Sequence, residues 1–133
     1  MADVLICGKD PTEIGVLEQL LYVAGVESES LSKMSHIVNS CLRGNHSLVL
    51  ISLRYGGWEG AEERLEVVRV LHEICPDLPI VVVSDPEDLD TERQLRSLGI
   101  FYLLTRPVSV NELKDVVECA MRRQQTDLRY RQT

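Results

Sequence analysis

The sequence lacks any apolar run that approaches the roughly 20 residues needed for a membrane-spanning helix. Its first residues, MADVLICGKD, lack the cationic stretch, apolar core and cleavage site of a signal peptide. Positive charge is in the minority: 14 Lys and Arg against 21 Asp and Glu give a net charge of −7. Direct nucleic-acid binding needs clustered cations, so this balance argues against it. We therefore expect a cytoplasmic protein with no membrane partner.

Closely spaced cysteine pairs are also absent. The four cysteines, Cys7, Cys41, Cys75 and Cys119, are scattered and form no C-x-x-C motif. A zinc site or a thioredoxin-like redox motif therefore has no support in the sequence, and we predict neither a metal nor a cofactor. We expect the cysteines to be small buried side chains of a protein in a reducing compartment.

The main feature that is present is an alternation of short apolar runs with segments of helical spacing. The apolar runs cover residues 4–7, 48–51, 80–83 and 100–104, and residues 26–31 alternate weakly between apolar and polar, as in an edge strand. Such runs indicate strands, and helical patterns follow each of them. Five strands that alternate with five helices predict one α/β domain, with helices on both faces of a parallel sheet. A chain of 133 residues is long enough to bury an ordinary core.

The ends of the predicted strands carry the candidate functional residues. In an open parallel sheet, ligands bind in the crevice beyond the carboxyl ends of the strands. Those ends are Gly8-Lys9-Asp10, Ser52-Leu53-Arg54, Ser84-Asp85 and Thr105-Arg106-Pro107.

Three of these stretches share a pattern with a known family. They are LVLISLRYGGWEG at 48–60, DLPIVVVS at 77–84 and YLLTRPVSVNEL at 102–113. Over about residues 3–121 the chain resembles the receiver domain of bacterial response regulators, the CheY-like domain of two-component signal transduction. The resemblance implies a flavodoxin-like, three-layer α/β/α fold with a five-stranded parallel sheet in the order 2-1-3-4-5. It also implies a receiver-like domain at 1–121 and a helical extension or linker at 122–133.

The resemblance fails where receivers carry their phosphotransfer chemistry. The position of the phosphoacceptor aspartate holds Ser52, and the positions of the acidic pair hold Gly8 and Lys9. The position of the lysine before the proline holds Arg106, followed by Pro107. Mg²⁺ needs oxygen ligands, mainly carboxylates and waters, which these residues do not supply. A serine hydroxyl is a weak nucleophile without an adjacent base.

Two further positions belong to the conformational switch of receivers. Ser84 retains the switch hydroxyl, whereas the aromatic position holds Leu103, with Tyr102 one place away. Because side chains alternate along a strand, Tyr102 is expected on the face opposite Leu103. The sequence therefore predicts a degenerate receiver, not an enzyme, that acts in signal transduction or transcription regulation by protein contact without phosphorylation.

The resemblance also nominates an interaction surface. Receivers commonly pair through the fourth helix, fifth strand and fifth helix, which correspond to residues 88–121. We expect a homodimer or a protein partner there, with Arg93, Arg96 and Tyr102 as contacts, and a covalent downstream output domain. Trp58, the only tryptophan, is a second candidate contact because tryptophan is enriched at interface hot spots.

Three alternatives remain open from the sequence. Lys9 and Arg106 could form a cationic crevice that binds an anion, or Lys9 could pair with a nearby carboxylate and fill an inactive site. Cys7, near the strand end and Lys9, could act as a redox sensor if its thiol has a low pKa. Residual phosphoacceptor activity is the enzymatic alternative.

Overall fold

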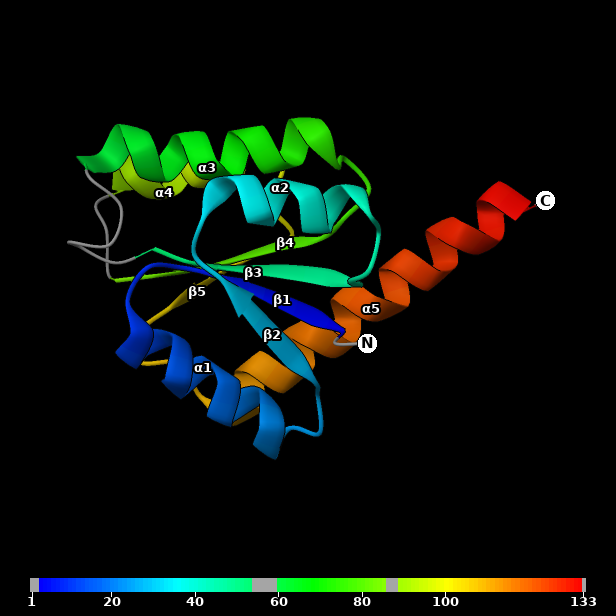
Figure 1. The fold of residues 1–133 in the computed structure, drawn as a ribbon, viewed down its shortest axis with the longest axis horizontal. Helices are drawn as coiled ribbons and strands as arrows, with labels where there is room; N and C mark the ends of the chain where they lie inside the picture. The colour runs from blue at the N-terminus through cyan, green and yellow to red at the C-terminus, as the bar shows by residue number, and fades with distance from the viewer. Residues whose placement is uncertain (1–2, 54–59, 86–88, 133) are drawn as a thin grey trace.

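The computed structural model describes residues 3–53, 60–85 and 89–132 and shows one twisted parallel sheet (Figure 1). Its strands are β1 (Val4–Cys7), β2 (Ser28–Leu31), β3 (Leu48–Ser52), β4 (Ile80–Ser84) and β5 (Tyr102–Thr105). The strand order is β2-β1-β3-β4-β5 and every pairing is parallel, which confirms the predicted topology. The two outer strands are shorter than predicted, because β2 begins at Ser28 and β5 at Tyr102.

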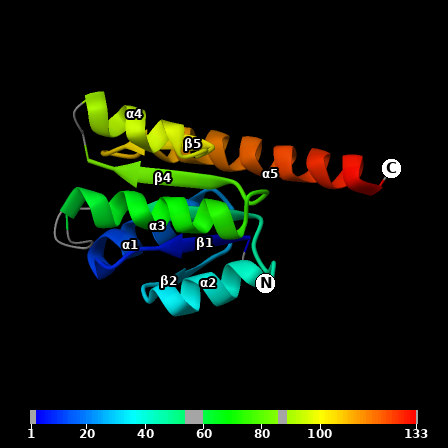
Figure 2. The same cartoon turned by 90° about the horizontal axis from the view of Figure 1, so that it is seen from above.

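Within the described residues, five helices cover the two faces of the sheet. They are α1 (Pro11–Val23), α2 (Met34–Leu42), α3 (Gly60–Ile74), α4 (Leu89–Ser97) and α5 (Val110–Gln132). Helices α1 and α5 lie on one face, and α2, α3 and α4 lie on the other (Figures 1 and 2). Helix α5 is continuous to Gln132 and its last turns project past the sheet (Figure 1). A domain boundary at residue 121 stays a prediction.

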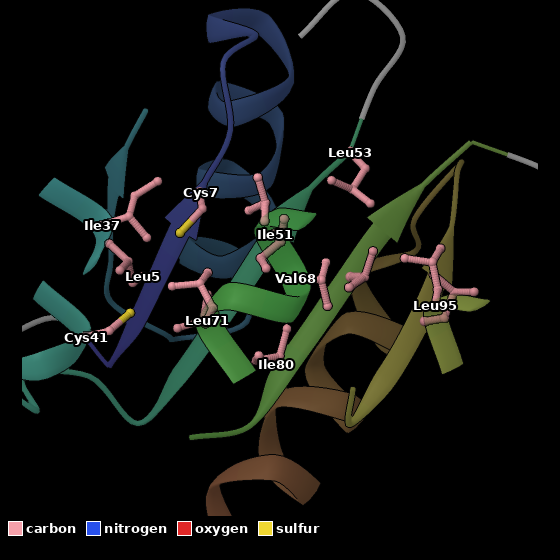
Figure 3. Close-up of a cluster of buried hydrophobic side chains, with 14 residues drawn as sticks. Leu5, Cys7, Ile37, Cys41, Ile51, Leu53, Val68, Leu71, Ile80 and Leu95 are labelled. Atoms are coloured by element: carbon pink, nitrogen blue, oxygen red, sulfur yellow. The ribbon is translucent and has the colours of Figure 1, made fainter. Parts of the chain in front are cut away.

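The sheet separates two apolar clusters. Alternate residues of β3 point to opposite faces: Val49 and Ile51 join the cluster under α2, α3 and α4, which Figure 3 shows. Leu48 and Leu50 join the cluster under α1 and α5. Each fully buried aliphatic side chain contributes about 1.5–3 kcal/mol, so the central strands need apolar residues on both faces. This requirement explains the continuous apolar runs in the sequence.

Local signals fix the beginning of the helices that border the carboxyl edge. The Asp10 carboxylate accepts a hydrogen bond from the backbone N–H of Thr12 at 3.1 Å, and Pro11 occupies the first helical position. The Ser109 hydroxyl accepts from the N–H of Glu112 at 3.1 Å and caps α5. In the part of the chain that the structure describes, no helix is both long and apolar enough to span a membrane.

Candidate functional site

The side chain of Arg106 organises the crevice at the carboxyl edge of the sheet. Its Nε donates to Glu13 Oε1 at 2.7 Å, and its Nη2 donates to Ser52 Oγ at 2.9 Å. Its Nη1 donates to the backbone oxygen of Leu53 at 2.8 Å and contacts Asp85 Oδ1 at 3.4 Å. One guanidinium therefore ties together α1, β3 and the loop after β4, as the convergence of parallel strand ends predicts.

This network is largely shielded from solvent. The Arg106 and Glu13 side chains are 13% and 9% exposed. The backbone holds Arg106 in place, because its N–H donates to the carbonyl oxygen of Ser84 at 2.9 Å. The Arg106–Pro107 peptide bond is cis. A buried guanidinium that faces two carboxylates carries no spare positive charge, so it does not attract a further anion.

The geometry does not favour the alternative in which Lys9 and Arg106 together form a cationic crevice. Arg106 is neutralised by Glu13 and Asp85. Lys9 is exposed and lines two cavities at the ends of β1 and β2, and Arg106 lines neither of them.

Gly8 occupies a position with no room for a side chain. A Cβ at this residue would lie 2.7 Å from Ile14 Cδ1 and 3.2 Å from Ser52 Cβ. A larger residue therefore fits here only if the end of the Ile14 side chain moves and Ser52 yields by a few tenths of an ångström. Because Gly8 is buried between α1 and β3, glycine suits the close packing at this position.

The residues present do not fit the Mg²⁺ ion that a working receiver holds. Mg²⁺ binds carboxylate oxygens together with waters. The Glu13 and Asp85 carboxylates already contact the guanidinium of Arg106. In residues 3–53, 60–85 and 89–132, no three His, Cys, Asp or Glu side chains come together as a metal site.

Sequence reasoning missed the role of Glu13 in this site. Its position predicted a helix start, but its carboxylate is the partner of Arg106 from the first turn of α1. The sequence spacing was a signal, because Glu13, Leu17 and Leu21 follow one another at steps of four and so share one face of the helix. In the structure all three are buried. A lone acid on the apolar stripe of a helix points to a buried partner of opposite charge.

The residues at the predicted switch positions lie on β4 and β5. Ser84 is buried at the end of β4, and Leu103 packs in the cluster under α2, α3 and α4. Tyr102 is 43% exposed at the start of the outer strand β5. Arg93 and Arg96 are exposed on α4, and Trp58 lies outside the described residues.

The cysteine thiols differ in exposure, which partly corrects the expectation that all four are buried. Cys7 and Cys41 are buried, Cys75 is partly buried and Cys119 is exposed on α5. Burial, and then the nearby Cys41, raise the pKa of Cys7 well above its ordinary value. Burial, with Cys75 as a smaller cause, raises the pKa of Cys41 to about 11. Little Cys7 thiolate therefore exists at neutral pH, which argues against a redox role for this residue.

Comparison with known proteins places the fold. No family model matches the chain. The chain is 26% identical over 118 residues to the C4-dicarboxylate transport transcriptional regulatory protein DctD of Pseudomonas aeruginosa. The match covers 89% of this chain and 25% of that protein, so the chain spans about a quarter of that curated relative.

Solved structures give the same fold at lower identity. A response regulator receiver domain protein from Clostridium thermocellum matches with a TM-score of 0.78 and 19% identity, over 95% of this chain and 98% of that one. The receiver domain of a modulated diguanylate cyclase from Desulfovibrio desulfuricans matches with a TM-score of 0.77 and 20% identity, over 96% of this chain and 98% of that one. NtrX from Brucella abortus matches with a TM-score of 0.81 and 17% identity, over 97% of this chain and 29% of that one. The chain therefore has the flavodoxin-like fold of CheY-like receiver domains.

Proposed function

We propose that this chain is a degenerate receiver domain of a two-component response regulator. It acts in signal transduction or transcription regulation through protein contacts that do not require aspartyl phosphorylation. The fold and the similarity to a transcriptional regulatory protein support the receiver role. The contact of the Arg106 guanidinium with Ser52 Oγ and the Glu13 carboxylate carries the rest of the proposal.

The chemistry of the crevice favours a module without phosphotransfer. Ser52, at the phosphoacceptor position, is 4% exposed and accepts a hydrogen bond from Arg106. A general base is needed to activate a hydroxyl, but the Glu13 carboxylate is engaged by Arg106 Nε. Gly8 and Lys9 supply no acidic pair for a metal ion. The guanidinium thus stabilises the crevice permanently, without a phosphoryl group.

The proposed output is a contact with a protein partner or a second copy through α4, β5 and α5, residues 88–121. Arg93, Arg96 and Tyr102 are exposed and available for such a contact. We also propose a covalent output domain, because the chain matches only 25% of DctD and 29% of NtrX. The continuous helix α5 is a suitable connection to such a domain.

Treatment with acetyl phosphate and Mg²⁺, followed by intact-mass measurement, tests this proposal. We expect no adduct on the wild-type chain, while a receiver that retains its aspartate gains one phosphoryl group under the same conditions. Ser52→Ala serves as the matched variant, because an adduct that it retains does not arise at Ser52. A stoichiometric adduct on the wild-type chain that hydroxylamine removes would overturn the proposal.

A further inference from the structure

Strand β2 is an edge of the sheet and shares a groove with the neighbouring helix α1 (Figures 1 and 2). Two cavities follow this groove, one of about 540 Å³ near the start of β2 and one of about 370 Å³ near its end. Glu18 of α1 lines both cavities, so they are neighbours along the helix. On the strand side the lining includes Ser28, Ser30 and Ser32, whose small side chains leave the groove open.

Part of the backbone of β2 faces away from the sheet. Backbone N–H groups of the β1 segment donate to the carbonyl oxygens of Glu27 at 3.2 Å and of Leu31 at 3.3 Å, so both residues face β1. Because the backbone groups of successive strand residues point to opposite sides, those of Ser28 and Ser30 point away from β1. An edge with such outward groups can pair with a further extended chain.

The groove also carries negative charge. Glu18 and Glu27 line the first cavity, and neither carboxylate has a cationic partner in the part of the chain that the structure describes. Tyr22 lines the same cavity and is 79% exposed, so its ring is accessible to a cation. Lys9 lines the second cavity but already has an interaction partner, so it does not offset these carboxylates. The groove therefore complements a positively charged ligand.

We propose that the groove between α1 and β2 binds an extended, basic segment of a partner protein, which adds to the sheet as a further strand beside β2. The backbone of this segment pairs with Ser28 and Ser30, and its Lys or Arg side chains lie along α1 toward Glu18 and Tyr22. A second copy of this chain is a poorer occupant, because it would bring the glutamates of two β2 edges together. The proposal goes beyond the receiver role and does not depend on it.

Amide hydrogen exchange of the full chain, measured by NMR during titration with a basic peptide, tests this site. The probe is a short peptide of alternating lysine and valine with blocked ends, whose valines favour an extended conformation. We expect saturable shifts at Glu18 and Tyr22. Exchange at the amides of Ser28 and Ser30 should slow about tenfold when nine-tenths of the chain is bound, because it then proceeds from the unbound tenth. Exchange at Leu31, which faces β1, should stay the same.

A second peptide and three variants separate the charge from the backbone pairing. The matched peptide of alternating glutamate and valine is expected to cause neither change. Glu18→Gln removes one carboxylate of the groove and is expected to weaken binding of the basic peptide about threefold. Glu73→Gln removes the same charge from exposed α3, on the other face of the sheet, and is the matched control with unchanged binding.

The variant Ser30→Pro removes one outward N–H from β2. An edge strand tolerates proline where the N–H faces away from the sheet, so we expect an unchanged far-UV circular dichroism spectrum. Loss of this hydrogen-bond donor is expected to weaken binding of the basic peptide about tenfold.

Saturable peptide shifts without slower exchange at Ser28 and Ser30 would overturn the inference, because no strand is then added. Equal binding of the acidic peptide, or wild-type affinity in Glu18→Gln, would also overturn it, because charge then does not select the partner. Exchange that is slow at Ser28 and Ser30 before the peptide is added, and that quickens on dilution, would identify a second copy as the occupant instead. None of these results bears on the phosphoryl measurement, so the two proposals fail independently.

Discussion

Replacement of Arg106 by methionine is expected to lower the free energy of unfolding by about 3–5 kcal/mol. The loss is large because it leaves the Glu13 carboxylate, 9% exposed, without its guanidinium partner. Ser52 Oγ and the Leu53 carbonyl oxygen also lose a hydrogen-bond donor. Urea denaturation followed by circular dichroism measures the change, provided that the denaturant slope stays constant.

Two further variants show whether the buried ion pair causes this loss. The Arg69→Met variant breaks the exposed pair with Glu66. Its free energy of unfolding should fall by only a small fraction of the loss in Arg106→Met, because solvent screens the exposed pair. The double variant Glu13→Leu, Arg106→Met removes both charges and should recover most of the stability. Equal losses for Arg69→Met and Arg106→Met would contradict the structural role of Arg106.

The change Gly8→Ala is expected to destabilise the chain by about 1–3 kcal/mol through overpacking. The added methyl group would lie 2.7 Å from Ile14 Cδ1 and 3.2 Å from Ser52 Cβ. Gly15→Ala adds the same methyl group to the interior of α1, where nothing lies within 4 Å. Alanine favours helix over glycine, so we expect Gly15→Ala to stabilise the chain by about 0.5–1 kcal/mol.

Opposite signs for these two changes are the decisive result, because the chemical change is the same. The thermal midpoint of each variant gives the comparison directly. A neutral Gly8→Ala would mean that α1 and β3 leave room at this position. An aspartate at residue 8 would then be sterically acceptable, and the packing argument against an acidic pair would fail.

The fold was predictable because strands buried on both faces must be apolar throughout. The runs at β1, β3 and β4 therefore stand out, and their alternation with helices sets the topology. The outer strands were less predictable. Strand β2 contains Ser28, Glu29 and Ser30, and its residues are partly buried or exposed. Pattern alone does not fix the bounds of such a strand.

The site was predictable only in part. Topology brings Ser52, Ser84 and Arg106 to one edge, and the structure confirms this convergence. The direction of long side chains is not encoded in strand order, so the pairing of Arg106 with Glu13 from α1 was missed. For the same reason the sequence left open whether Lys9 shares the crevice with Arg106, and the structure places Lys9 exposed beside other cavities.

The central claim is that Arg106 and its partners leave the crevice unable to hold a metal ion. Titration with Mg²⁺ through the millimolar range, monitored at the backbone amides of Gly8, Ser52 and Asp85, tests it most directly. The account predicts no saturable shift at these amides, because the guanidinium already engages the Glu13 and Asp85 carboxylates. Saturable shifts at these three amides that a chelator reverses would contradict it.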